Sequence, residues 1–238
     1  MFISKEGIMY KKEMFVIFFT IQVVCISHAQ VKWTETFIEN TSSFASRGSN
    51  PYFILEPGYQ LQLKGGEEGK AIDVVITVLD QTQTVDGVET RVVEERETVD
   101  GELVEVSRNF FAIGKETNNV YYFGEEVDIY KNGKIVSHDG AWQSGVNGAR
   151  FGLMIPGTAL LGSRYYQEIA PGIAMDRAEL VSMSETVSTP AGHFENCLKT
   201  EETTPMNPKE KSEKCYARGI GLIQDGDVSL THHGVMKK

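Results

Sequence analysis

Residues 84–114 read TVDGVETRVVEERETVDGELVEVSRNFFAIG, strand-like segments separated by Asp-Gly pairs. Asp86-Gly87 and Asp100-Gly101 supply the positive φ angles that tight hairpin turns require, and Asn132-Gly133 repeats the signal downstream. Between these turns, valines alternate with charged residues at a period of two, which is typical of β-strands. The stretch therefore predicts a series of antiparallel hairpins, a meander.

The same pattern of short strands and turns continues on both sides of this stretch. The predicted strands are residues 59–64, 71–80, 88–98, 103–113, 119–123, 126–131, 134–138, 164–168, 177–188, 193–203, 210–217 and 221–225. Only residues 176–184 also suit a helix. We therefore predict an all-β fold, an antiparallel meander that forms a curved sheet, a half-barrel or a barrel.

The two faces of the predicted sheet differ along the chain. In residues 88–106 the charged side chains at 89, 91, 95, 97 and 105 lie among valines, which indicates one face in water. By contrast, Phe110-Phe111, Tyr121-Tyr122 and Tyr165-Tyr166 place rings on both faces, because successive side chains point opposite ways. Both faces must be covered there. Residues 140–162, rich in glycine and apolar side chains, are predicted to cover the concave face, although the rings also suit an ordinary sandwich or barrel core.

Charge and the N-terminus limit the class of protein. The 238 residues contain 33 Asp and Glu against 23 Lys and Arg, a net charge of −10. Such a field repels polyanions and argues against nucleic-acid binding. Lys11 and Lys12 precede an apolar run that ends in Ser27-His28-Ala29, which predicts a signal peptide over residues 1–29. The run is shorter than the ~20 residues of a membrane-spanning helix, so we expect a secreted or periplasmic protein without a membrane span after cleavage.

Composition also divides the remaining chain. Residues 30–50 are small and polar, and we expect a flexible lead-in. Residues 51–228 form one predicted β domain, and residues 229–238 a C-terminal tail.

Two cysteines remain after the signal peptide. In an oxidising compartment, pairing of Cys197 with Cys215 is the default expectation. If the chain turns near Met206, one register places three complementary pairs opposite each other: Cys197 with Cys215, Lys199 with Glu213, and Glu201 with Lys211. We therefore predict a disulfide bond.

Signatures of common enzymes are absent from the sequence. It contains no G-x-S-x-G elbow, H-E-x-x-H helix, P-loop or G-x-G-x-x-G loop. Carboxylates at 94–97, 125–128 and 225–227 lack the spacing of a calcium loop and suit solvated strand faces. We expect no metal and no cofactor. The remaining catalytic hypothesis is a hydrolase in which His138 acts as base beside Asp139 and Ser144.

Several unusual strings occur in one order along the chain: YYFGE at 121–125, Trp142 followed by GVNGA at 145–149 and MIPG at 154–157, TPAGHFENCLKT at 189–200, and YARGIGL at 216–222. In these strings the chain resembles a group of exported bacterial all-β proteins of unknown function. The motif of a strand, a Pro-Ala-Gly turn, Phe194 and a second strand also looks like exported β-proteins whose curved sheet is similar to the half-barrel of periplasmic lipoprotein carriers. The resemblance implies an exported β-protein and no particular activity.

Rings and the glycine-rich segment together predict a binding site. The candidate ligand-binding residues are Phe111, Tyr122, Trp142, Met154 and Tyr166. The favoured function is a non-catalytic binding or carrier module for an apolar or amphipathic small molecule. Two alternatives stay open: the hydrolase at His138, Asp139 and Ser144, and an envelope or extracellular protein-interaction domain with an exposed apolar patch. The sequence defines neither the ligand nor the oligomeric state.

Overall fold

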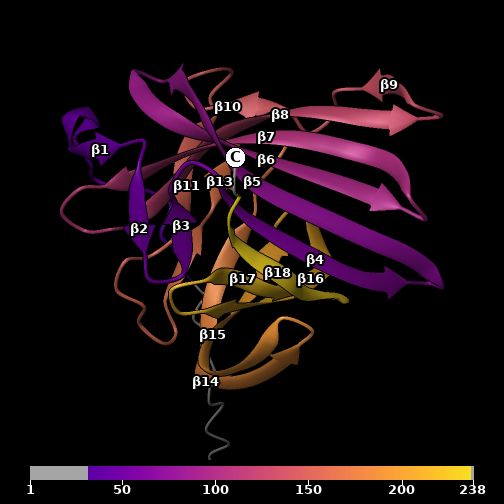
Figure 1. Ribbon diagram of the computed structural model, residues 1–238. Helices are drawn as coiled ribbons and strands as arrows, with labels where there is room; N and C mark the ends of the chain where they lie inside the picture. Colours follow the sequence, from indigo (N-terminus) through magenta and orange to yellow (C-terminus); the bar gives the residue numbers. More distant parts are fainter. Residues whose placement is uncertain (1–31, 237–238) are drawn as a thin grey trace, which may run out of the picture. The chain divides into compact units, whose positions relative to one another are not determined.

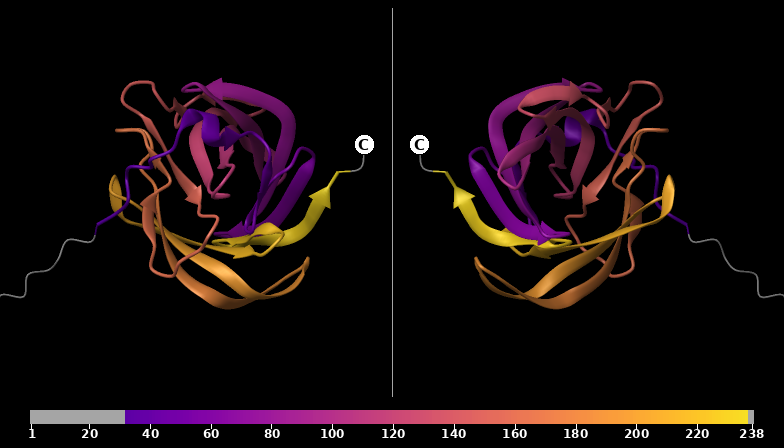
Figure 2. Two further views of the ribbon diagram at one scale, coloured as in Figure 1. Left: turned by 90° about the vertical axis from the view of Figure 1, so that its left-hand side faces the viewer. Right: turned by 90° about the vertical axis from the view of Figure 1, so that its right-hand side faces the viewer.

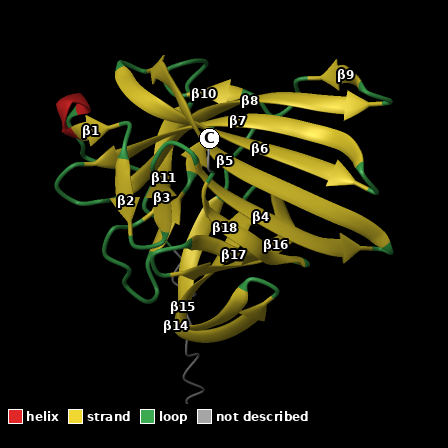
Figure 3. Ribbon diagram, viewed as in Figure 1, coloured by secondary structure: helices red, strands yellow, loops and turns green. Residues whose placement is uncertain are grey.

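The computed structural model describes residues 32–236, so the signal-peptide prediction lies outside it. Within this range, strands dominate and the single helical element is the 3₁₀ turn η1 (Thr41–Ser43), which confirms the all-β prediction (Figures 1 and 3). The strands are β1 (Phe44–Ala45), β2 (Gly48–Asn50), β3 (Phe53–Leu55), β4 (Tyr59–Glu67), β5 (Lys70–Val85), β6 (Val88–Val99), β7 (Glu102–Gly114), β8 (Val120–Lys131), β9 (Lys134–Ser137), β10 (Trp142–Gln143), β11 (Arg150–Ile155), β12 (Arg164–Tyr166), β13 (Glu168–Ile169), β14 (Arg177–Thr189), β15 (Gly192–Thr204), β16 (Asn207–Ala217), β17 (Gly221–Asp225) and β18 (Val228–Val235). None of the described helices is long and apolar enough to cross a membrane.

The predicted hairpin turns are confirmed. Asp86 and Gly87 have φ angles of 49° and 75° between β5 and β6, and Asp100 and Gly101 have 52° and 81° between β6 and β7. Positive φ at both central positions is the geometry of a tight hairpin whose twist matches the strands. The long strands β5 to β8 therefore follow one another as neighbours in a meander (Figure 1).

The sheet runs in the order β12-β14-β15-β16-β17-β18-β4-β5-β6-β7-β8-β11-β13. One pair in this order joins the two halves of the sequence, because β18 lies antiparallel to β4, from Val228 opposite Gly65 to Val235 opposite Tyr59. Residues 229–235, which the composition placed in a C-terminal tail, belong to this strand. The last strand of the chain thus completes the wall between the N-terminal and C-terminal meanders.

The two ends of this strand order meet at one point of the chain. Arg164–Tyr166 pairs with β14 at one end, and two residues later Glu168–Ile169 pairs with β11 at the other. Gln167 lies between them, and its N–H donates to the carbonyl of Asp176 at 2.8 Å. The sheet therefore curves into a nearly closed barrel (Figure 2).

The glycine-rich segment contributes two strands to this wall. In β10, Trp142 lies opposite Glu125, and in β11 Gly152 lies opposite Tyr122 of β8. Because β11 also pairs with β13, residues 150–155 are part of the barrel closure itself. The sequence pattern predicted no strand here, since glycines and Pro156 interrupt the alternation.

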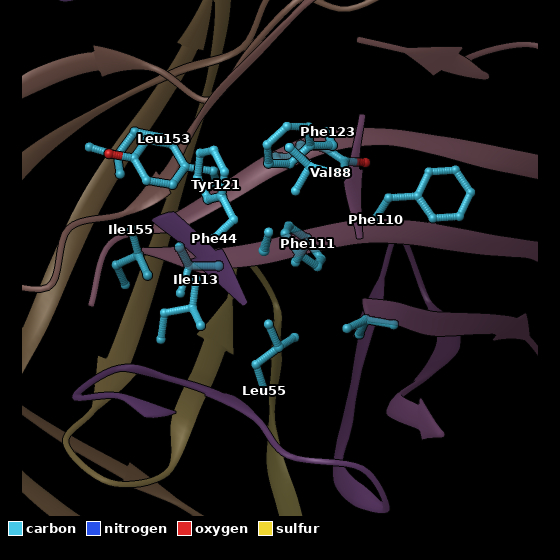
Figure 4. Packing of buried hydrophobic residues seen from close by; sticks show 14 of the residues in the cluster. Phe44, Leu55, Val88, Phe110, Phe111, Ile113, Tyr121, Phe123, Leu153 and Ile155 are labelled. Atoms are coloured by element: carbon cyan, nitrogen blue, oxygen red, sulfur yellow. The ribbon is translucent and has the colours of Figure 1, made fainter. Parts of the chain in front are cut away.

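The rings of β8 are covered on both sides, as their pattern requires. Tyr121 and Phe123 contact Phe44 edge-on at centroid distances of 5.4 and 5.3 Å (Figure 4). Phe151 stacks on Phe123 at 4.7 Å. Phe44 is 7% exposed and comes from β1, within the expected lead-in. The N-terminal segment and the glycine-rich segment therefore cover one face of β8 together, and Tyr122 points to the other.

The predicted register of β15 and β16 is wrong by two residues. Leu198 lies opposite Tyr216 and Lys199 opposite Cys215, so Cys197 and Cys215 are diagonal neighbours on one face. Both are buried free thiols, and the disulfide stays a prediction. The predicted charge pairs form diagonally, because long side chains span the offset: Lys199 Nζ lies 2.7 Å from Glu213 Oε2, and Lys211 Nζ lies 2.8 Å from Glu201 Oε2.

Gly152 tests the closure of the barrel. A Cβ built there would collide with backbone atoms of Tyr166 and Gln167. We expect Gly152→Ala to lower the free energy of unfolding by about 3 kcal/mol, since two backbones must move apart. The matched control is Gly162→Ala, where φ is +82° but no atom lies within 4 Å, and the expected loss is about 1 kcal/mol. Urea denaturation measures the free energy of unfolding of both variants. Equal losses would contradict the close contact between Gly152 and the backbone of Tyr166 and Gln167.

Candidate functional site

A cavity of about 300 Å³ lies inside the barrel, within the size range of small-molecule sites. One part of its lining is apolar and comes from β3 to β8, β11, β16 and β17, and from the loops that precede β3, β14 and β17. The apolar and aromatic residues are Tyr52, Phe53, Ile54, Tyr59, Leu61, Ile76, Val78, Val93, Phe111, Tyr122, Met154, Ala174, Tyr216, Ile220 and Leu222. The closed sheet therefore encloses space that its side chains do not fill.

The other part of the lining is acidic. Six carboxylates face the cavity: Glu95 of β6, Glu125 of β8, Glu168 of β13, Asp176, Glu202 of β15 and Asp225 of β17. Lys214 of β16 is the one basic residue among the lining side chains. Its Nζ lies 3.1 Å from Glu202 Oε2 and 3.4 Å from Asp225 Oδ2. Most of the carboxylates therefore have no positive side chain to balance them.

This arrangement corrects the expectation of a solvent face in residues 88–106. Arg91 is 6% exposed, and its Nε donates to the carbonyl of Ser46 at 2.9 Å. Glu95 lies opposite Ile76 and Ser107, and all three side chains belong to the inner surface. Alternation defines which residues share a face, but it does not say which face is wet. Here Glu95 and Glu97 of β6 line the cavities inside the barrel, while Glu89 is exposed.

Glu125 belongs to a hydrogen-bonded group with Tyr122 and Asn109. Asn109 Nδ2 donates to the carbonyl of Val93, which leaves its Oδ1 to accept from the Tyr122 hydroxyl at 2.6 Å. The Tyr122 oxygen also contacts the Glu125 carboxyl. This hydrogen bond from Tyr122 by itself lowers the pKa of the carboxyl. Burial, together with the charges of nearby carboxylates, raises the pKa of Glu125 to about 7.

Glu95 has a different environment. Burial raises its pKa to about 7; Lys214 lowers it, while Asp225, Glu105 and Glu97 raise it. Among the described residues, no side chain or backbone N–H is seen to donate a hydrogen bond to the Glu95 carboxyl. A partly buried carboxylate without a donor is costly in the charged form, which is why this group holds its proton.

Glu168 and Asp176 form a carboxyl pair at the closure of the barrel. Glu168 is 4% exposed, and its Oε1 accepts the N–H of Asp176 at 2.9 Å. Burial and the neighbouring Asp176 raise the pKa of Glu168 well above its ordinary value, and burial also raises the pKa of Asp176. Next to this pair, Gln167 Nε2 donates to Glu202 Oε1 at 2.9 Å. The chain switch that closes the barrel is therefore hydrogen-bonded to its acidic interior.

Three of the five predicted site residues line the cavity: Phe111, Tyr122 and Met154. The Phe111 and Tyr122 rings stack at 4.8 Å. Trp142 is 5% exposed and packs edge-on against Tyr122 at 5.3 Å, outside the set of lining residues. Tyr166 lies outside that set too, and its ring contacts Trp33 at 6.5 Å. Ligand contact by any of the five stays a prediction.

The sequence pattern missed the acidic half of the lining. Its members come from separate strands and a loop, so no spacing in the chain connects them. Their only local signal is a glutamate within a strand, and that signal is identical for an inner and an outer face. Within the described residues, no group of three or more His, Cys, Asp and Glu side chains is placed to hold a metal ion.

The residues of the hydrolase hypothesis do not lie together. His138 Nδ1 lies 2.8 Å from the carbonyl of Val127 and 3.0 Å from Asp128 Oδ1. Ser144 is anchored elsewhere: its N–H donates to the carbonyl of Phe123, and its hydroxyl donates to Asp86 at 2.8 Å. Those two carbonyls are four residues apart on β8, roughly 13 Å at the rise of a strand. Asp139 is exposed in the turn after β9.

Comparisons with protein families and with curated proteins find no match to the chain. Among solved structures, it is similar to a protein of Parabacteroides distasonis that is provisionally assigned as a lipoprotein, with 13% sequence identity and a TM-score of 0.36. The similarity covers 79% of this chain and 100% of the other. A likeness this low carries no argument about function. The resemblance to exported bacterial proteins therefore rests on the sequence strings alone.

The acidic interior predicts an unusual dependence of stability on pH. An unfolded glutamate loses its proton near its ordinary pKa of 4.5, whereas folded Glu95 and Glu125 keep theirs to about 7. Between these values the folded state binds more protons, so stability is full below pH 4.5 and falls as pH rises through 7. We expect the free energy of unfolding to fall by about 3 kcal/mol from pH 5 to pH 8, allowing for water in the cavity.

Urea denaturation at pH 5, 6, 7 and 8 measures this slope. Glu95→Gln removes one of the carboxyls whose pKa is raised and should make the slope less steep. Glu126→Gln is the matched control, because Glu126 is the exposed neighbour of Glu125 on the same strand, and its slope should equal that of the unchanged protein. Equal slopes in the two variants would contradict the proton held by Glu95.

Proposed function

We propose that the protein is a non-catalytic binding or carrier module for an amphipathic small molecule, held in the barrel cavity. The observation that carries the proposal is a cavity of about 300 Å³ whose lining combines many apolar side chains with a set of ionisable ones. Ligand sites are typically concave and largely apolar, with a few polar groups that orient the ligand. In line with the predicted signal peptide, the proposal is of an exported protein.

The presence of both apolar and ionisable side chains in the lining favours an amphipathic ligand over a purely apolar one. A hydrocarbon chain gains about 25 cal/mol for each Å² of apolar surface that it buries against side chains such as Phe53, Val78 and Phe111. The same chain placed against Glu95 and Glu202 would remove water from polar groups without replacing its hydrogen bonds, which costs free energy. A molecule with one apolar and one polar end satisfies both surfaces.

The interior is also elongated. A second cavity of about 280 Å³ shares Ile76, Glu95, Leu222 and Asp225 with the first. Its remaining lining is apolar near β4 and β5, with Leu63, Ile72, Val74 and Val228, and acidic elsewhere, with Glu97 and Asp227. The two cavities therefore adjoin at these four residues, an arrangement that suits an extended ligand.

Filling the cavity tests this function. Leu222 lines both cavities, and Leu222→Trp should occupy the space between them. The probe is N-phenyl-1-naphthylamine, an uncharged molecule that fluoresces in apolar sites. We expect saturable binding at one site per chain, and an affinity at least about 10-fold lower for Leu222→Trp, as expected when the ligand loses roughly 1.4 kcal/mol of contacts.

The control places the same side chain on the surface. Leu161→Trp alters a residue that is 66% exposed, in the turn before β12, and should leave the affinity unchanged. Circular dichroism shows whether each variant keeps the β fold. Absence of binding by the unchanged protein, or equal affinities in folded Leu222→Trp and Leu161→Trp, would refute the cavity as the binding site.

A further inference from the structure

The charge of the cavity lining extends the proposed function, on which this inference rests. We infer that the ligand carries a cationic head group and is an organic amine with an apolar tail. Glu95 and Glu125 would bind the ammonium, and the aromatic and aliphatic lining would hold the tail. The chemical class follows from three features of the cavity: the geometry of the carboxylates, the state of Lys214 and the hydrogen bonds that Glu95 lacks.

Glu95 and Glu125 point into the cavity from one wall. Glu95 of β6 shares its row with Ser107 of β7, and Glu125 of β8 shares the next row with Asn109. The two strands are separated by β7, so their backbones lie roughly 10 Å apart. Ser107 between them is small. The two carboxyls are near enough for the charge of Glu95 to raise the pKa of Glu125, and both line the same cavity.

Lys214 approaches from the other side of the barrel but is already engaged. It lies between Glu202 and Asp225 at 3.1 and 3.4 Å. Burial alone would lower the pKa of Lys214, but the two carboxylates raise it well above its ordinary value. The ammonium group therefore stays charged. With one cation for six lining carboxyls, the cavity has excess negative charge once Glu95 and Glu125 lose their protons above pH 7. A carboxylate or phosphate ligand would have to displace Glu202 or Asp225 and would be repelled by the others.

Glu95 lacks the partner that an ammonium provides. No hydrogen bond to its carboxyl is seen among the described residues, and it lines both cavities. An ammonium has three N–H donors on one centre and forms strong, charge-assisted bonds to carboxylates in a partly dry site. A ligand amine would therefore replace the proton that Glu95 otherwise holds. The carboxylates are distributed over several strands, whereas calcium prefers six to eight oxygens in one compact shell.

Proton release links this binding to pH. The ionisable groups that face Glu95 are Glu97, Glu105, Lys214 and Asp225, and those that face Glu125 are Tyr122, Glu95, Glu105, Glu168 and Asp176. With the pKa of both glutamates at about 7, an amine binds to their charged forms above pH 7 and competes with protons below it. Affinity for an amine should therefore rise about 10-fold from pH 5.5 to pH 8.

Calorimetry with three probes of equal chain length tests the inference: octylamine, octanol and octanoate, each with the purified protein at pH 8. We expect octylamine to bind about 10-fold tighter than octanol and octanoate to bind most weakly. Glu95→Gln and Glu125→Gln should each weaken octylamine about 10-fold and change octanol less than 2-fold. Glu126→Gln, on the outer face of the same strand, should change neither.

Lys214→Met distinguishes a site for a cationic ligand from a site for an anionic one. Removal of the resident cation should leave octylamine binding at least as tight as in the unchanged protein, whereas a site for fatty acids would lose octanoate. If this variant does not fold, the glutamine variants decide, because Gln keeps the shape of Glu.

The outcomes distinguish the inference from the function beneath it. Octanol bound as tightly as octylamine at pH 5.5 and pH 8 would overturn the cationic head group and leave the binding function standing. Octanoate bound most tightly, and lost in Lys214→Met, would also overturn the amine. Absence of binding by all three probes, together with no uptake of N-phenyl-1-naphthylamine, would refute both proposals.

Discussion

At Gln167 the chain leaves one end of the sheet and joins the other, and the rest of the structure depends on this switch. Arg164–Tyr166 pairs with β14, while Glu168–Ile169 pairs with β11. Without it, β11 and β14 would be edge strands with unpaired backbone groups, and the two meanders would be held together only by β18 and β4. Closure requires the backbones to approach closely, and Gly152 provides the space.

Closure also explains why the interior is ionisable. Gln167 and Glu168 belong to the switch, and they link directly to Glu202 and Asp176 through hydrogen bonds of 2.9 Å. Once the sheet is closed, alternate side chains of every strand must point inward, including glutamates that an open sheet would expose. The low dielectric of this interior favours protonated carboxyls over charged ones. The chain switch at Gln167 therefore determines both the closed fold and the burial that raises the pKa of the inward-facing carboxyls.

Local features could be predicted from the sequence because they depend on few residues. Asp-Gly and Asn-Gly pairs defined the hairpins, and the paired rings correctly required cover on both faces of β8. Of the three cavity residues that were named, Phe111 and Tyr122 came from that same pattern and Met154 from the glycine-rich segment. What could not be predicted depends on distant contacts. The strand β11 forms between two partners despite its glycine, and the register of β15 with β16 differs by two residues although both registers keep every side chain on its face.

The raised pKa values of Glu95 and Glu125 imply that these carboxyls lower stability once they are charged. Replacement of a partly buried carboxylate by an apolar side chain of similar volume is often neutral or stabilising. Glu202 and Asp225 are held by Lys214, and Glu168 by the backbone of Asp176. Glu95 has no comparable contact among the described residues. A side chain that costs stability without contributing to the packing of the fold is typical of functional sites. Glu95 is therefore the residue at which the structure and the proposed ligand depend on each other most directly.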